Sequence, residues 1–394
     1  MKKRCFCMIC LLFFCLLSAA QKNAVIRELK KNYITYPFSD PNPVPSFTKI
    51  YPYFRFDGFT TTPLRKEWKV IQLENDFIRL EVFPEIGGKV WSAYDKIHRR
   101  YFLYNNNVVK FRDIAMRGPW TSGGVEFNYG TIGHTPNTAT PVDYKLDTNT
   151  DGSVRCIIGC LEMLTRTRWN VEIKLEKDKA YFTTRSFWFN ATSVEQPYYQ
   201  WSNSAVYAKE DLQLIYPGAA AIGHSGEVVS WPYDSVNKKQ VSNWKENNYG
   251  SSKSFHIVNS SKPYFGAYWR DADFGMLHYT AGDEKLGRKM FSWALSDQGA
   301  IWKELLTDKD GQYVEMQSGR LFNQNSITSS LTPFKQTRFI PYGTDEWTEY
   351  WYPFAGTGGV TDANELGVLG IAGGTLKISA LGFIKDTLLV QDSN

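Results

Sequence analysis

Cysteine is nearly absent beyond the first twenty residues of this chain. Four of the six cysteines fall at positions 5, 7, 10 and 15, and only Cys156 and Cys160 follow. In a strand, a separation of four residues spans about 13 Å, which is too far for a disulfide. With no His or second Cys pair nearby in sequence, we expect two buried free thiols rather than a metal site.

Other sequence features are also missing, and each absence excludes a class of function. The net charge of +5 is spread thinly, with no basic run of the kind that binds nucleic acid. No glycine motif for a phosphate or dinucleotide appears. Asp147 to Gly152, DTNTDG, matches half of a calcium loop, but Ile158 stands where the loop needs Glu. We therefore predict a polar hairpin turn there, and no metal or cofactor.

The first twenty residues have the pattern of a secretory signal peptide. Lys2, Lys3 and Arg4 precede an apolar run that is too short for a membrane span, and Ser18-Ala19-Ala20 follows it. A lipid anchor is disfavoured because Cys15 follows two phenylalanines. We expect an exported protein, periplasmic or extracellular, with no membrane insertion after cleavage.

Aromatic residues are abundant, at 15% of the chain. Some of them must fill a core, but Tyr and Trp also line sites that need a flat apolar face beside a polar tip. A sugar ring, with its axial C–H groups, is one such ligand.

The pattern along the chain predicts an all-β protein. Residues 21–66 read as an N-terminal arm, with a short helix over AVIRELKKNY and then a proline-rich extended stretch. Residues 67–354 show repeated period-2 alternation with turns at Asn, Asp and Gly, beginning with a hairpin around residues 74–76. We predict two large stacked antiparallel sheets. Residues 355–394 read as a glycine-rich linker and a partial β segment.

The first hairpin resembles that of the galactose-mutarotase-like superfamily, and further motifs narrow the resemblance. The matching hairpin residues are Leu73, Asn75, Val82, Pro84, Gly87, Gly88 and Val90. RGPWTSGGVEFNYGTIGHTP, WSNSAVYAKEDLQLIYP, YVEMQSGRLFNQ and EWTEYWYP look like a domain-of-unknown-function family of that superfamily, often found ahead of tetratricopeptide repeats. The resemblance covers about Glu67 to Phe354. It implies a β-supersandwich that binds carbohydrate on the concave face of its larger sheet.

Glu315 is the first candidate catalytic residue. Alternation places Tyr313, Glu315 and Gln317 on one face of a strand, with Val314 and Met316 on the other. That arrangement suits a wet groove. The resemblance to aldose epimerases implies that Glu315 is the base that removes the anomeric hydroxyl proton.

The stretch from Arg117 to Pro136 supplies the other candidates. Gly123, Gly124 and Gly133 allow sharp turns that can aim Glu126 and His134. Histidine can donate a proton near neutral pH, and epimerases use a loop His in this way, although their local motif differs. Glu126 is then a second carboxylate or a ligand to sugar hydroxyls.

We expect the remaining binding residues to come from the same motifs. Arg117 could clamp hydroxyls or a carboxylate, or pair with Asp113. The predicted substrate-binding set is Arg117, Trp120, Tyr129, Trp201, Asn203, Tyr313 and Gln317. Asn203 and Ser204 stand where epimerases carry a second His, which argues against simple mutarotase chemistry. We expect His278 in the core or at the edge of the groove, His98 at the surface, and His224 in a glycine loop that could reach the groove.

Three functions therefore compete. The first is an enzyme acting at an anomeric centre, either an epimerase or a glycoside hydrolase with Glu126 and Glu315 as its carboxylate pair. The second is a uronate lyase, for which Tyr129 could be the base and Arg117 the carboxylate clamp. The third is a non-catalytic glycan-binding module.

Overall fold

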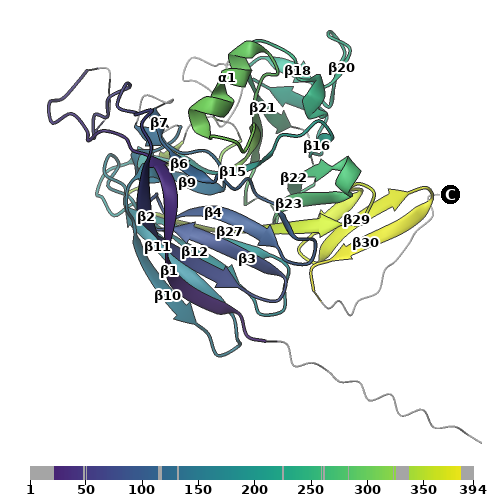
Figure 1. Ribbon diagram of the computed structural model, residues 1–394, viewed down its shortest axis with the longest axis horizontal. Helices are drawn as coiled ribbons and strands as arrows, with labels where there is room; N and C mark the ends of the chain where they lie inside the picture. Colours follow the sequence, from purple (N-terminus) through teal and green to yellow (C-terminus); the bar gives the residue numbers. More distant parts are fainter. Residues whose placement is uncertain are drawn as a thin grey trace, which may run out of the picture.

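The computed structural model describes residues 22–47, 49, 51–113, 118–130, 133–223, 226–258, 260, 262–282, 284–322, 324 and 337–382. Two large sheets dominate the described chain and pack against each other (Figure 1). They confirm the expectation of an all-β protein built from large sheets, which are mostly antiparallel, with a parallel strand pair at one edge of the larger sheet.

The larger sheet has thirteen strands. Twelve follow the order β18-β17-β21-β24-β25-β15-β9-β4-β3-β2-β1-β6, and β5 pairs with β4. The strands are β1 (Val25–Tyr36), β2 (Leu64–Glu74), β3 (Ile78–Phe83), β4 (Lys89–Asp95), β5 (Arg100–Tyr101), β6 (Val108–Lys110), β9 (Val125–Tyr129), β15 (Gln200–Tyr207), β17 (Ala220–Ile222), β18 (Val228–Ser230), β21 (Ser252–Val258), β24 (Gly287–Trp293) and β25 (Tyr313–Gly319).

The second sheet has eight strands in the order β10-β11-β12-β13-β27-β23-β22-β16. They are β10 (Asp143–Thr148), β11 (Val154–Leu161), β12 (Arg168–Leu175), β13 (Phe182–Phe189), β16 (Leu212–Ile215), β22 (Tyr264–Trp269), β23 (Phe274–Thr280) and β27 (Thr344–Ala355).

Short elements complete the described chain. The small sheets are formed by β7 (Arg112–Asp113) with β8 (Pro119–Trp120), β14 (Gln196–Pro197) with β26 (Arg338–Phe339), β19 (Tyr233–Asp234) with β20 (Lys239–Gln240), and β28 (Asp362–Asn364) with β29 (Gly367–Ala372) and β30 (Thr375–Ala380). The helices are α1 (Asp297–Leu306) and the 3-10 turns η1 (Pro136–Ala139), η2 (Trp244–Glu246) and η3 (Arg270–Ala272). Within the described ranges, no helix has the length and apolar character needed to cross a membrane.

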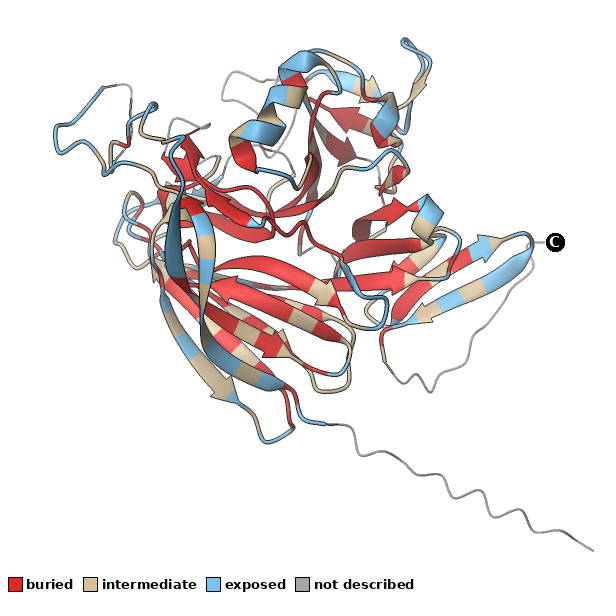
Figure 2. Cartoon of the chain, in the orientation of Figure 1, coloured by how far each residue is buried: buried red, intermediate tan, exposed pale blue. Residues whose placement is uncertain are grey.

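The core lies between the two sheets, where apolar side chains of both meet. Leu80 of β3, Val171 of β12 and Trp351 of β27 are fully buried members of this cluster. Buried residues run along the strands of both sheets, whereas β1, β10 and α1 expose one face (Figure 2). The cluster thus supports the larger sheet from one side and leaves its other side for a site.

The helix predicted near the N-terminus is wrong, because those residues form strand β1. It pairs antiparallel with β2 through eleven residue pairs, from Val25↔Glu74 to Thr35↔Leu64. Tyr33 packs edge-on against Phe83 and Trp91. Here pairing and burial override the helix propensity of a Lys- and Glu-rich stretch. The predicted hairpin around residues 74–76 is confirmed, since the Asn75 side-chain oxygen accepts bonds from two backbone N–H groups of the turn, each 2.8 Å long.

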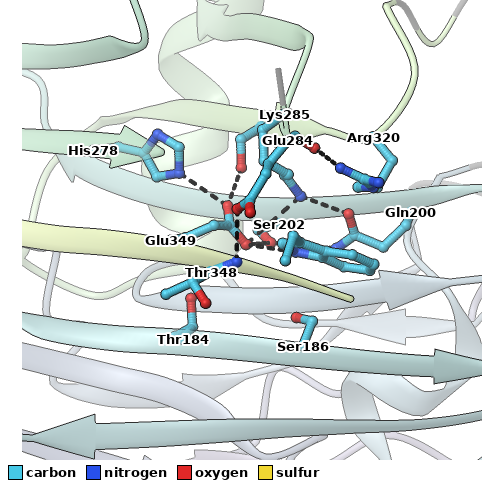
Figure 3. A network of polar contacts seen from close by, with 12 residues as sticks. Thr184, Ser186, Gln200, Ser202, His278, Glu284, Lys285, Arg320, Thr348 and Glu349 are labelled. Carbon is cyan, nitrogen blue, oxygen red and sulfur yellow. Dashed lines mark hydrogen bonds and ion pairs between the residues drawn. The ribbon is translucent and has the colours of Figure 1, made fainter. Parts of the chain in front are cut away.

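A buried polar network joins the two sheets (Figure 3). Glu349 on β27 accepts hydrogen bonds from Ser202 of β15 at 2.8 Å, from His278 of β23 at 2.9 Å, and from Ser318 of β25. Its carboxylate also lies 3.6 Å from the Lys285 ammonium, and both side chains are fully buried. Although burial opposes its charge, Lys285 and His278 lower the pKa of Glu349 to about 2. An ionised carboxylate thus holds the two sheets together from inside the core.

Removing this charge should destabilise the fold. We expect Glu349→Gln to lower the free energy of unfolding by about 3–5 kcal/mol, because the Lys285 ammonium would remain buried without its partner. The matched control is Glu346→Gln, at an exposed position of the same strand, which should change stability by less than about 1 kcal/mol. Urea unfolding at pH 7 measures both, and equal effects would contradict this account.

Candidate functional site

One row of side chains crosses four neighbouring strands of the larger sheet. The register pairs Glu126 of β9 with Asn203 of β15, Asn203 with Gln317 of β25, and Gln317 with Lys289 of β24. Paired residues of adjacent strands point to the same face. This face is the one turned away from the core, so the row forms the floor of a candidate site.

A cleft of about 670 Å³ opens over this floor. Its polar lining includes Asn128, His134, Asn203, Lys289, Glu315 and Gln317. Its aromatic lining includes Trp201, Phe291, Trp293 and Trp302. A concave surface that combines aromatic faces with convergent polar groups is typical of a small-molecule site.

Glu126 and His134 form a hydrogen-bonded pair at one end of the row. Nδ1 of His134 contacts Oε1 of Glu126, and the Glu126 side chain also accepts a bond from Asn128 at 3.1 Å. The close approach of β9 to β4 depends on Gly124, where φ is +62° and a Cβ atom would lie 2.0 Å from the Val90 carbonyl oxygen. Without a side chain there, β9 can begin beside β4 and bring Glu126 to the floor.

Lys89 lies beside this pair, on β4. It is 1% exposed, its ammonium donates to the Thr121 carbonyl oxygen at 2.5 Å, and it lies 3.8 Å from Glu126. Burial lowers the pKa of Lys89 to about 8, although Glu126 and Glu315 oppose this. A buried cation therefore lies next to the Glu126 carboxylate.

The charges of Glu126 and His134 stabilise each other. Burial opposes the Glu126 charge, but His134 and Lys89 outweigh it and lower the pKa of Glu126 to about 2. Burial also opposes a charge on His134, but the Glu126 carboxylate outweighs it and raises the pKa of His134. The pair is thus an ionised carboxylate that holds a histidine by Nδ1 and favours its protonated form.

Glu315 lines the same cleft as His134, as predicted. Its two oxygens accept hydrogen bonds from Tyr313 at 3.1 Å and from Gln317 at 2.7 Å. Val314 and Met316 point the other way into the core, so the predicted alternation of this strand is confirmed. The structure therefore brings the proposed base and the proposed acid to one cleft.

The predicted binding residues have different places in the structure. Trp201, Asn203 and Gln317 line the cleft. Trp120 and Tyr313, each 2% exposed, form an aromatic layer beneath, and the Trp120 ring lies 4.8 Å from the His134 ring. These two side chains pack beneath the residues of the cleft instead of lining it.

The placement of Tyr129 in the binding set is wrong. On β9 it points to the same side as Val125 and Phe127, away from Glu126 and Asn128. Its ring stacks on Trp169 at 4.8 Å, and its hydroxyl donates to Ser186 in the core. Arg117 lies outside the described residues, and Asp113, its expected partner, pairs with Lys49 at 3.0 Å.

Other residues singled out in the sequence lie away from the cleft. His278 is buried in the network around Glu349, and His98 is at the surface, where it pairs with Asp95. His224 lies outside the described residues. Cys156 and Cys160 are free, the former buried and the latter partly buried, and burial raises the pKa of both thiols to about 12.

The DTNTDG stretch forms the end of β10 and the turn that leads into β11, so the predicted hairpin is confirmed. In the described part of the chain, no three His, Cys, Asp or Glu side chains are grouped closely enough to hold a metal ion.

Sequence reasoning missed several residues of the site. Lys89, Lys289, Asn128 and Gln324 were not predicted, nor were the cleft aromatics Phe291 and Trp293. A signal was present for part of this set, because Gly287, Lys289, Phe291 and Trp293 alternate along β24. Alternation shows that they share a face, but it does not show that this face lines a cleft.

Comparison with known proteins supports the fold assignment. A TPR-domain containing protein from Parabacteroides distasonis has a TM-score of 0.74 at 24% identity over 84% of this chain. This chain spans 56% of the length of that protein. The Slr1438 protein of Synechocystis has a TM-score of 0.51 at 11% identity, covering 79% of this chain and 98% of its own.

A galactose mutarotase-like protein from Lactobacillus casei has a TM-score of 0.50 at 9% identity, covering 72% of this chain and 99% of its own. The fold is therefore galactose mutarotase-like. In sequence, residues 45–354 match the family described as a domain of unknown function, DUF5107. With most of its length inside that match, the chain belongs to the DUF5107 family.

Proposed function

We propose that this protein catalyses acid–base chemistry at the anomeric centre of a sugar. The observation that carries the proposal is the anchoring of His134 Nδ1 to the ionised Glu126 carboxylate at the cleft that Glu315 also lines. A histidine held by one ring nitrogen has the other available for proton transfer. The likeness in fold to a galactose mutarotase-like protein supports a sugar as the ligand.

The proposed reaction is an exchange of anomers. Glu315 takes the proton of the anomeric hydroxyl, while His134 gives a proton to the ring oxygen. The bond between the anomeric carbon and the ring oxygen breaks and a carbonyl group forms. Rotation about the adjacent C–C bond and reversal of both transfers give the other anomer, and both residues return to their starting states.

The alternatives fit the geometry less well. A two-carboxylate hydrolase needs a second carboxyl group that can exchange protons with substrate, but Glu126 is buried, ionised and engaged by His134 and Lys89. A lyase with Tyr129 as its base is contradicted, because that side chain is in the core. A non-catalytic glycan-binding module is the competing function, since the aromatic lining of the cleft could bind a sugar without any catalysis.

We further propose that the protein acts outside the cytoplasm. Support comes from the charged, apolar and small-residue pattern of residues 1–20.

Replacing the proposed base should separate catalysis from binding. We expect Glu315→Gln to slow anomer exchange by about 10²- to 10⁴-fold, because the amide cannot accept the proton, while sugar affinity changes little. Polarimetry of a freshly dissolved single anomer measures exchange, and calorimetry measures binding. The control, Glu304→Gln on the exposed face of α1, should behave as the wild type. Unchanged exchange in Glu315→Gln would remove this residue from the mechanism, and binding without exchange in the wild type would favour a binding module.

Because His134 is the proposed acid, the pH–rate profile should have a descending limb on its alkaline side. Activity should fall as pH rises through the raised pKa of His134, because the protonated ring is the donor. In Glu126→Gln the carboxylate that raises this pKa is gone, so the limb should move to lower pH and kcat/KM at pH 8 should fall by about 10- to 100-fold.

The measurement is kcat/KM between pH 5 and 9 for both proteins. The limb should be absent in His134→Gln, whose residual rate has no titrating donor. Superimposable profiles for the wild type and Glu126→Gln would show that the pair does not tune the acid.

A further inference from the structure

Lys289 is a buried cation in the cleft that the proposed mechanism does not use. It is 5% exposed, it is part of the cleft lining, and its ammonium donates to Gln324 Oε1 at 2.6 Å. An ammonium has three donors. No second partner of this ammonium is found among the described residues.

The other buried lysines each have a carboxylate partner. Lys89 lies 3.8 Å from Glu126, and Lys285 lies 3.6 Å from Glu349. In the described part of the chain, no carboxylate lies within ion-pair distance of Lys289. Buried charges in folded proteins are almost always paired, so Lys289 differs from the rule at a place that a ligand can reach.

Nearby carboxylates are engaged elsewhere. Asp113, which also lines the cleft, pairs with Lys49 at 3.0 Å. Glu315 attracts Lys289 only through space and accepts its hydrogen bonds from Tyr313 and Gln317. The sequence that follows Gln324, residues 325–336, contains no Asp or Glu and one lysine.

We propose that the cleft takes an acidic saccharide whose anionic group, a carboxylate or a sulfate ester, binds the Lys289 ammonium. The inference rests on the proposed sugar site and names its substrate class. An anion would complete the donors of Lys289 with charge-assisted hydrogen bonds, which are about twice as strong as neutral ones.

The floor of the cleft separates the anionic group from the end of the site that holds Glu126 and His134. Lys289 and Glu126 stand at opposite ends of the four-strand row, about 14 Å apart at the usual strand spacing. That length accommodates a reacting ring near His134 and Glu315 with an acidic group toward β24.

Two amide side chains connect the cation to the proposed base. Lys289 donates to Gln324, Gln324 donates to Gln317 at 3.2 Å, and Gln317 donates to Glu315 at 2.7 Å. Burial lowers the pKa of Lys289 to about 8. An anion bound there would favour the protonated form, so binding at pH 8 should be accompanied by proton uptake.

The test compares acidic ligands with neutral counterparts of the same shape. Calorimetry at low salt would use glucuronate, galacturonate and disaccharides containing them, each beside its methyl ester, and sulfated sugars beside unsulfated ones. We expect at least one acidic ligand to bind about 10-fold or more tightly than its neutral counterpart. The uronate and sulfate arms identify which anion the site takes.

Lys289→Met should abolish this preference and leave the affinity for the neutral counterpart unchanged. The proton uptake seen at pH 8 in buffers of different ionisation enthalpy should disappear with it. Lys253→Met, at an exposed position of the neighbouring strand β21, is the matched control and should keep the preference. Without ligand, Lys289→Met should be at least as thermally stable as the wild type, because removing a buried charge that has no carboxylate partner among the described residues offsets the lost hydrogen bond to Gln324.

Several results would overturn the proposal. They are equal affinity for acidic and neutral ligands, no binding of any pair at millimolar concentration, an equal loss of both affinities in Lys289→Met, or a marked loss of its stability. Failure of the proposed function has a different signature. A wild-type protein that prefers acidic sugars but does not exchange their anomers retains the Lys289 site and loses the catalytic assignment.

Discussion

The contact between Glu349 and the hydroxyls of Ser202 and Ser318 is the interaction on which the site depends. It joins β27 of the smaller sheet to β15 and β25 of the larger one, entirely within the core. Successive residues on a strand face opposite sides, so anchoring these serines from behind orients Asn203 and Gln317 on the cleft side. The position of the floor therefore follows from a polar contact in the core.

Charge is distributed differently on the core side and on the cleft side of the strands of the larger sheet. Behind them, the Glu349 carboxylate has both a lysine and a histidine as partners. In front of them, Glu126 has a similar pair of partners, His134 and Lys89, while among the described residues Lys289 has only an amide as its partner. In the core cluster, the negative charge of Glu349 is balanced by the positive charge of Lys285. The cleft, by contrast, carries a net positive charge when His134 is protonated. Ion pairs between carboxylates and lysines thus stabilise the core, whereas an unbalanced positive charge in the cleft is available to a ligand.

The sequence contained enough to predict the fold class and to single out Glu315 and His134, which line one cleft. Alternation around Glu315 defined its face, and the glycines around Glu126 and His134 marked a loop with constrained geometry. The same alternation, applied to β9, would have placed Tyr129 opposite Glu126, in the core. The helix expected over β1 failed because propensity does not register pairing with β2. Buried lysines such as Lys89 and Lys289 could not be predicted, since composition and hydropathy place lysine at the surface.

The two free thiols on β11 have a consequence for the reactivity of the folded protein. Thiol–disulfide exchange proceeds through the thiolate, and burial raises the pKa of Cys156 and Cys160 to about 12. At pH 7 only about one thiol in 10⁵ would be ionised in the native protein. Once folded, such a chain resists oxidation of these two thiols and their mixed-disulfide formation.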